Sequence, residues 1–334
     1  MLESLTPEDA VEAYLNERKS ELSDSSLQNQ RYRLNRFLEW CDEVGLDDMN
    51  DMTGRKAFEY KQWRSEGIKP ITLKTSLDTL RVFLRFCERI EAVPQGVHEK
   101  VSPPTITGNG DQSDAMIDTE AVDQILSYLD KWEYASLTHV VFYLLWHTGM
   151  RIGSAGALDL DDYDSDEGYV EIHNRPETGT QLKNKEHGER HVNLSREVCD
   201  VLDDFIAFNH GKTADDNGRM PLLGTAYGRP SLATIRRKVY QVTRPCVYTD
   251  ECPHDREIDD CEATKSGHAS KCPSSVSPHA IRRGSITYHL NAGVPKEVVS
   301  DRMNVSDEVL EKHYDKRTSS DRRSQRRSYL EGLD

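Results

Sequence analysis

The stretch from Val101 to Ala115 constrains the fold more than any other part of this sequence. It reads VSPPTITGNGDQSDA and combines Pro, Gly, Asn and Asp without any apolar periodicity. Such a composition indicates a linker, because it favours neither a helix nor a strand. A chain of 334 residues is long enough for two domains. We therefore expect a first domain over residues 1–100, a linker over 101–115 and a second domain over 116–334.

The first domain is predicted to be a bundle of four helices. Thr6 and Pro7 are typical of a helix start, and Gly45 is typical of the end of a second helix. A third, short helix is expected over residues 55–65. The fourth carries apolar residues at alternating steps of four and three, namely Leu73, Leu77, Leu80, Leu84 and Cys87. Helices with one apolar face in a domain of this size suit a compact bundle.

The second domain is predicted to be mainly α-helical with a small antiparallel β-sheet. An apolar helix should begin at Leu137 and break at Gly149. Residues 169–173 and 189–194 alternate as paired strands, and the loop NRPETGTQLKNKEHG connects them. Further helices are expected over 198–208 and 230–240. The whole chain therefore belongs to the mainly α class.

Three separated motifs carry chemical groups that are suited to binding and attacking a phosphodiester. Arg151 follows the break at Gly149, and His279 and Arg282 stand three apart, hence on one face of a helix. A guanidinium is a planar fork that fits two phosphate oxygens. Tyr314 follows about thirty residues later, and a tyrosine becomes a useful nucleophile when cations or a base assist it.

The order Arg, Lys, His-x-x-Arg, Tyr resembles the tyrosine recombinase, or phage integrase, family, most closely the Xer-like integrases of archaea. The resemblance covers nearly the whole chain. It implies a SAM-like core-binding domain followed by a catalytic domain that together clamp double-stranded DNA. It also implies that Arg151 and Arg282 grip the scissile phosphate while Tyr314 attacks it to form a 3′-phosphotyrosine link. His279 would assist proton transfer, and no cofactor would take part in catalysis.

Two positions of the family pattern stay open. A lysine in the loop between the strands protonates the leaving 5′ oxygen in the family. Lys183 and Lys185 both qualify, with a slight preference for Lys183, which lies nearer the strand end. Asn304 stands where the family usually has a histidine; we expect it to contact phosphate without carrying a proton.

The resemblance implies a site-specific recombinase that works as a homotetramer on paired DNA sites. One alternative is a DNA-binding protein of the same fold with weakened catalysis. Another is a type IB topoisomerase, which uses the same residue types. The helical first domain and the compact second domain favour the recombinase.

The net charge of −15 is unusual for a DNA enzyme. An acidic surface is typical of salt-loving organisms, where salt screens repulsion from DNA. The sequence has no apolar stretch long enough to cross a membrane and no signal-peptide pattern at its start. We expect a cytoplasmic protein.

Four of the seven cysteines fall in a predicted insertion over residues 246–272. Clustered thiols in a reducing compartment suggest a structural zinc site rather than disulfides. The expected ligands are Cys246, Cys252, Cys261 and Cys272, with His254 as a substitute.

Overall fold

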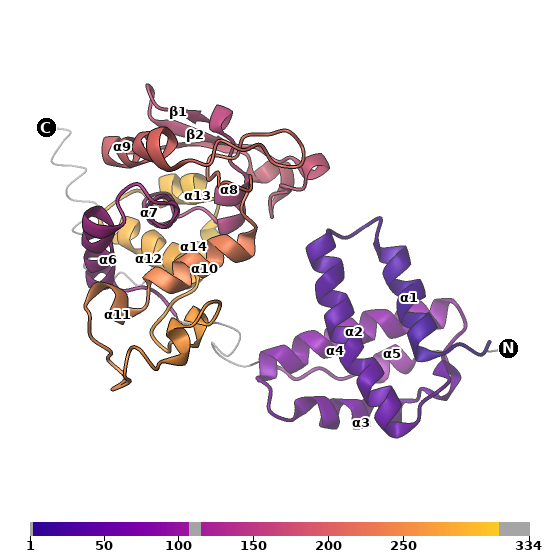
Figure 1. Cartoon of the computed structure of the whole chain (residues 1–334). Helices are drawn as coiled ribbons and strands as arrows, with labels where there is room; N and C mark the ends of the chain where they lie inside the picture. Colours follow the sequence, from indigo (N-terminus) through magenta and orange to yellow (C-terminus); the bar gives the residue numbers. More distant parts are fainter. Residues whose placement is uncertain (1–2, 107–114, 314–334) are drawn as a thin grey trace, which may run out of the picture. The chain divides into compact units, whose positions relative to one another are not determined.

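The computed structural model describes residues 3–106 and 115–313 (Figure 1). The chain divides into two compact units, Met1–Asp114 and Ala115–Asp334. Helices dominate both, and a three-stranded antiparallel sheet lies in the second unit. The predicted fold class, mainly α with a small antiparallel sheet, is confirmed.

The first unit is the expected helical bundle, extended by two short elements. Its elements are α1 (Pro7–Arg18), α2 (Asp24–Val44), η1 (Met49–Asp51), α3 (Gly54–Ser65), α4 (Pro70–Arg89) and α5 (Val97–Lys100). The hydroxyls of Thr6, Ser23 and Thr53 accept backbone N–H groups at three of the helix starts. Tyr14 and Phe37 both pack edge-on against Phe83 in the core.

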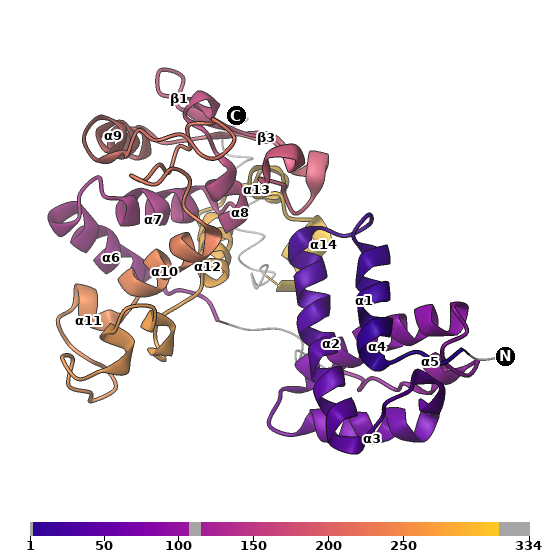
Figure 2. The same ribbon diagram turned by 45° about the vertical axis from the view of Figure 1, so that its right-hand side comes forward.

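The second unit contains nine α-helices among its described residues, the longest of 14 residues (Figure 2). They are α6 (Thr119–Trp132), α7 (Leu137–Thr148), α8 (Ile152–Ala157), α9 (Arg196–Asp204), α10 (Leu232–Val242), α11 (Pro245–Tyr248), α12 (Pro278–Asn291), α13 (Lys296–Met303) and α14 (Asp307–His313). A π-helical turn, η5 (Phe205–Asn209), extends α9 to roughly the length expected from the sequence.

The sheet has the order β1 (Tyr163–Asp164), β2 (Tyr169–Ile172) and β3 (Arg190–Asn193). The pairing of β2 with β3 places Val170 opposite Val192, with both side chains buried. These two strands lie within the predicted ranges. The first strand was not expected, because its acidic residues resemble a turn.

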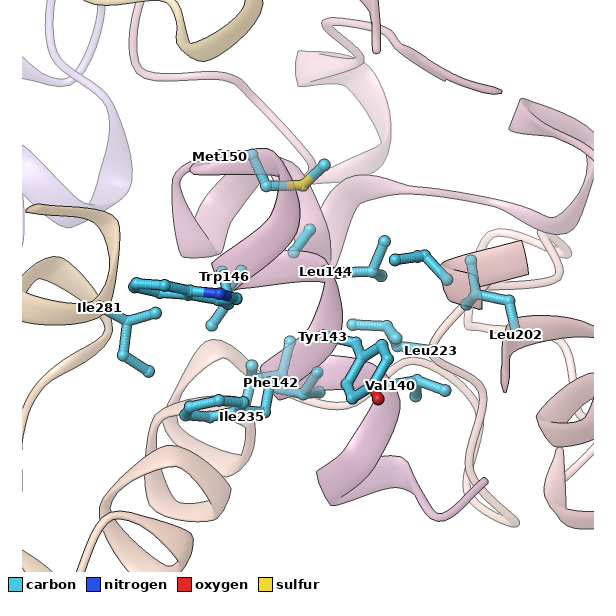
Figure 3. Packing of buried hydrophobic residues seen from close by; sticks show 14 of the residues in the cluster. Val140, Phe142, Tyr143, Leu144, Trp146, Met150, Leu202, Leu223, Ile235 and Ile281 are labelled. Atoms are coloured by element: carbon cyan, nitrogen blue, oxygen red, sulfur yellow. The ribbon is translucent and has the colours of Figure 1, made fainter. Parts of the chain in front are cut away.

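Helix α7 lies at the centre of the second unit and packs against α6, α9, α10 and α12. Figure 3 shows Phe142, Leu144 and Trp146 of this helix among Ile235, Ile281 and Leu202 from other segments. Burial on every side explains why α7 is an almost unbroken apolar run instead of an amphipathic one. This buried helix leads through Gly149 and Met150 to Arg151.

Within residues 3–106 and 115–313, no helix combines the length and the apolar character needed to cross a membrane.

Candidate active site

Arg151 is placed by a tight turn at the end of α7. Gly149 adopts the left-handed conformation, with φ of 59°, and its amide donates to the Leu145 carbonyl. The positive φ favours glycine, and a Cβ atom at this position would lie 2.6 Å from the Met303 sulfur, so the Met303 side chain of α13 would have to move. Arg151 then forms the N-cap of α8, half-buried beside the end of α13.

Arg282 is buried in α12, with 3% of its surface exposed. Its Nη1 donates to the carbonyls of Gly149, at 2.6 Å, and of Met303, at 2.7 Å, and its Nη2 donates to the Asn304 carbonyl at 3.2 Å. The last carbonyls of a helix lack partners within it. The guanidinium therefore joins the ends of α7 and α13 and adds positive charge beside Arg151.

His279 lies in the first turn of α12, after the N-cap Ser277. Partial burial lowers the pKa of its imidazole, and the positive charges of Arg283, Arg282, Arg151 and Lys183 lower that pKa further. Groups from the α7–α8 turn, the strand-connecting loop and α12 thus share one electrostatic environment. A histidine that is neutral at neutral pH can accept a proton.

The loop that carries both candidate lysines, residues 174–188, is called the lysine loop below. Leu182 is buried in the core of the second unit, and the side-chain Nδ2 of Asn184 donates to the side-chain Oδ1 of Asn304. Lys183 lies between these two anchored residues, with its side chain exposed. Lys185 is also exposed, but it begins a 3-10 turn with a φ of 50°. The burial of Leu182 and the hydrogen bond of Asn184 anchor the chain on both sides of Lys183.

Asn304 connects the lysine loop to Arg151. Its Oδ1 accepts from Arg151 Nη1 at 3.3 Å and from Asn184, and its Nδ2 donates to the His187 carbonyl at 2.7 Å. The two donors fix the orientation of the amide, because the opposite orientation would set NH₂ against them. Asn304 was expected to contact phosphate. In the structure its amide nitrogen donates to the lysine loop, and the contact with phosphate stays a prediction.

Arg190, at the start of β3, is a further cation of the site that the sequence analysis did not single out. Its Nε donates to the Arg302 carbonyl at 2.8 Å. Burial lowers its pKa to about 10, and the neighbouring charge of Arg151 contributes to the shift. A strand-initial arginine has no distinctive spacing, so only the pairing of β2 with β3 could have located it.

The expected nucleophile, Tyr314, lies outside the described residues. Helix α14 ends at His313, immediately before it. Leu310 of α14 is buried with Val299 and Met303 of α13, so the helix that leads to Tyr314 packs onto the element that contacts Arg282 and Gly149.

The cysteine-rich insertion lies wholly within the described residues. Burial raises the pKa of Cys246. The charge of Arg244 lowers this pKa, and the nearby thiols of Cys272, Cys252 and Cys261 raise it. The described residues nevertheless contain no group of three or more His, Cys, Asp or Glu side chains arranged to hold a metal. His254 instead shares a hydrogen bond of 2.9 Å with Ser274. The described side chains therefore give no support to the closed zinc site that the spacing predicted, and this site stays a prediction.

The chain is similar to several known proteins. A sequence profile described as "Phage integrase family" matches residues 115–319. A probable integrase/recombinase protein of Methanocaldococcus jannaschii is 23% identical over 311 residues, which cover 90% of this chain and 84% of that protein.

Two solved structures share the fold over most of the chain. The Tn1549 transposon integrase in complex with a circular intermediate DNA has a TM-score of 0.68 at 15% identity, over 99% of this chain and 100% of that chain. A lambda integrase dimer bound to a COC′ core site has a TM-score of 0.65 at 12% identity, over 95% of this chain and 79% of that chain.

Proposed function

The chain belongs to the phage integrase family of tyrosine recombinases, enzymes that break and rejoin DNA, and we propose that it does so through a covalent 3′-phosphotyrosine intermediate at Tyr314. The observation that carries this proposal is the shared environment of Arg151, Lys183, His279 and Arg282. The charges of Arg151, Lys183 and Arg282 act on the His279 imidazole although these residues are separated by up to 131 positions of sequence. Hydrogen bonds join the same segments, because Arg282 donates to the Gly149 carbonyl and Asn304 accepts from both Arg151 and Asn184.

Each group has a distinct role in the proposed cleavage step. The phenol oxygen of Tyr314 attacks the scissile phosphorus and gives its proton to the neutral His279. Arg151 and Arg282 stabilise the added negative charge on the phosphate in the transition state. The bond to the 5′ oxygen breaks, and this oxygen takes a proton from Lys183. Attack by a 5′ hydroxyl of another strand reverses the step, and because the covalent link conserves the bond energy, no ATP is consumed.

Lys183 is the better candidate for the general acid. Its charge acts on His279, and the residues on both sides of it are anchored. Lys185 occupies the left-handed start of an exposed turn. We assign Asn304 a positioning role, in which it holds Arg151 and the lysine loop together.

The nucleophile is tested with a nicked duplex whose cleaved fragment diffuses away, so that a covalent adduct accumulates. The parent protein should give a denaturation-resistant DNA adduct, and Tyr314→Phe should give none. Tyr227→Phe is the matched control, because Tyr227 is 95% exposed in a loop of the same unit. An adduct that survives in Tyr314→Phe would assign the nucleophile to another residue.

The general acid is tested with a duplex that carries sulfur in place of the bridging 5′ oxygen. A thiolate leaves without protonation, so this substrate should restore cleavage by Lys183→Ala. Lys185→Ala should cleave the oxygen substrate nearly as well as the parent. The reverse pattern would transfer the role to Lys185.

The proposed substrate is double-stranded DNA, bound in the cytoplasm by a homotetramer on paired sites. The solved relatives were crystallised on DNA, in one instance as a dimer. Exchange of strands between two duplexes distinguishes a recombinase from a topoisomerase, which would relax supercoils without exchange. Binding without any adduct would instead indicate a protein whose catalysis is weakened.

The chemistry of this family generally needs no cofactor. Zinc at the four insertion cysteines stays a prediction, since thiolates suit the metal although their present arrangement does not enclose one. Elemental analysis of protein purified without chelators tests it, and about one equivalent per chain would be the expected stoichiometry of a single site.

A further inference from the structure

We propose that Arg219 is a positioning residue that fastens the lysine loop to the segment following α8. This inference rests on the proposed role of a loop lysine as the general acid. It concerns a partly buried cluster of three arginines and three aspartates, which the proposed chemistry does not use.

One side of the Arg219 guanidinium binds the last residue of α8 and the segment that follows this helix. Its Nε donates to Asp159 Oδ2 at 2.8 Å, and its Nη2 donates to the Ala157 carbonyl at 3.1 Å. Asp159 is 7% exposed, so this carboxylate is held away from solvent. A planar fork with fixed donors suits such a buried contact better than a flexible ammonium.

The other side of the same guanidinium binds the lysine loop. Its Nη1 donates to the hydroxyl of Thr180 at 2.9 Å and to the hydroxyl of Thr178. Thr180 precedes Lys183 by three residues. The Leu182 amide donates to Asn174 Oδ1 at 2.9 Å and completes the anchoring of this side of the loop. Arg219 is thus a direct bridge between the Arg151 segment and the Lys183 segment.

The surrounding charges hold this bridge in place. Arg175 binds Asp162 through two hydrogen bonds of 2.6 and 2.8 Å and lies 3.3 Å from Asp159. Asp215 binds Arg229 Nε at 2.8 Å. Together with Arg219 the cluster contains three positive and three negative groups, so it is formally neutral. Salt screens partly buried pairs much less than exposed ones.

Arg229 provides a matched control within the cluster. It donates to the same carboxylate, Asp159, but its other hydrogen bonds go to the carbonyls of Gly156 and Leu158 and to Asp215. A change at Arg229 therefore disturbs the buried charges without removing a contact to the lysine loop. A change at Arg219 disturbs the same charges and also removes the contacts to Thr178 and Thr180 of the lysine loop.

The position of the loop matters because the lysine must meet the leaving oxygen within hydrogen-bond distance. Lys183 has an exposed side chain, so its aim depends on the main chain that carries it. A displacement of about 1 Å at a reacting group can reduce a rate by about a hundredfold. Loss of the Thr180 contact should therefore impair protonation of the leaving group and leave attack by the nucleophile unchanged.

The experiment compares cleavage of the oxygen and sulfur duplexes by Arg219→Lys, Thr180→Val, Arg229→Lys and Lys183→Ala. Arg219→Lys should cleave the oxygen duplex at least about tenfold more slowly than the parent and the sulfur duplex at nearly the parental rate. Thr180→Val should show the same selectivity, with a smaller loss. Arg229→Lys should affect both duplexes equally. Thermal unfolding verifies that each variant is folded, and Thr180→Val alone decides the question if Arg219→Lys is not.

Equal losses on both duplexes for Arg219→Lys and Thr180→Val, beside a selectively restored Lys183→Ala, would overturn the positioning role. A Lys183→Ala variant that sulfur does not restore would instead refute the proposed general acid. Selective restoration of Arg219→Lys in that case would still support its role in aiming the group that protonates the leaving oxygen.

Discussion

Acidification should lower the stability of the second unit because of His147, which lies two residues before Gly149. Burial lowers the pKa of His147 from 6.5 to about 4, and the nearby charges of His289 and Arg302 add to this shift. Its Nε2 is buried and has no hydrogen-bond partner among the described residues. The folded protein therefore holds this ring neutral at a pH where the unfolded chain already binds a proton.

The direction and size of this change in stability follow from the linkage between proton binding and folding. Between pH 6.5 and 4 the unfolded state binds more protons than the folded state, so stability falls as the pH falls through this window. A shift of this size corresponds to about 3 kcal/mol when the window has been crossed completely, at about 1.4 kcal/mol per pH unit. At pH 5 the loss from His147 should already be about 2 kcal/mol.

The comparison is between the parent and His147→Phe, which keeps a ring beside Tyr143, whose ring centroid lies 5.0 Å away. Native-state hydrogen exchange of the α7 amides, corrected for the intrinsic rate at each pH, reports the second unit alone. His139, in the same helix, also has a pKa lowered to about 4 by burial, so the variant should retain part of the loss. His147→Phe should lose about 2 kcal/mol less than the parent between pH 7.5 and 5.

An exposed histidine supplies the control. His191→Phe, on the surface of β3, should lose as much stability on acidification as the parent. If His147→Phe and the parent lose equal free energy between the two pH values, the explanation based on a buried neutral imidazole is wrong.

Three further changes test separate contacts. Gly149→Ala should cost about 2 kcal/mol or more in thermal unfolding, because it combines a positive φ with a Cβ 2.6 Å from the Met303 sulfur. Gly153→Ala, which meets nothing within 4 Å, should cost little. Asn304→Gly preserves the left-handed backbone and removes the amide, so DNA cleavage should fall while the unfolding temperature is kept; unchanged cleavage would exclude the positioning role. Ser285→Ala removes a buried hydroxyl that donates to an α7 carbonyl and should cost about 1 kcal/mol in urea unfolding, whereas no cost would show that this bond contributes nothing.

The sequence predicted those elements whose formation depends on local pattern. Helix α2 ends at Gly45 and α7 ends at Gly149, both in the left-handed conformation, as a glycine at a helix end indicates. The apolar run from Val140 to Trp146 could be recognised as a buried helix because every side of it is apolar. These features need no knowledge of distant contacts.

The arrangement of the candidate site depends on contacts that no local pattern encodes. The Asn304 amide meets Arg151 and Asn184, which lie 153 and 120 positions away in the sequence. Comparison with the family pattern shows that Asn304 replaces the usual histidine. It does not show that Asn304 connects the lysine loop to Arg151. The cysteine spacing was equally ambiguous, because metal ligation depends on how the loop brings the thiols together. Arg219 belongs to no recognisable sequence motif.

Arg282 has a structural role in the second unit as well as its proposed role in binding the phosphate. Its guanidinium satisfies three main-chain carbonyls at the ends of two helices, so selection for a folded protein alone would retain it. A descendant that had abandoned strand exchange would still need this arginine. Its presence in a related gene is therefore no sign of activity. Inheritance of function is better traced through Lys183, whose exposed side chain has no comparable structural role among the described residues.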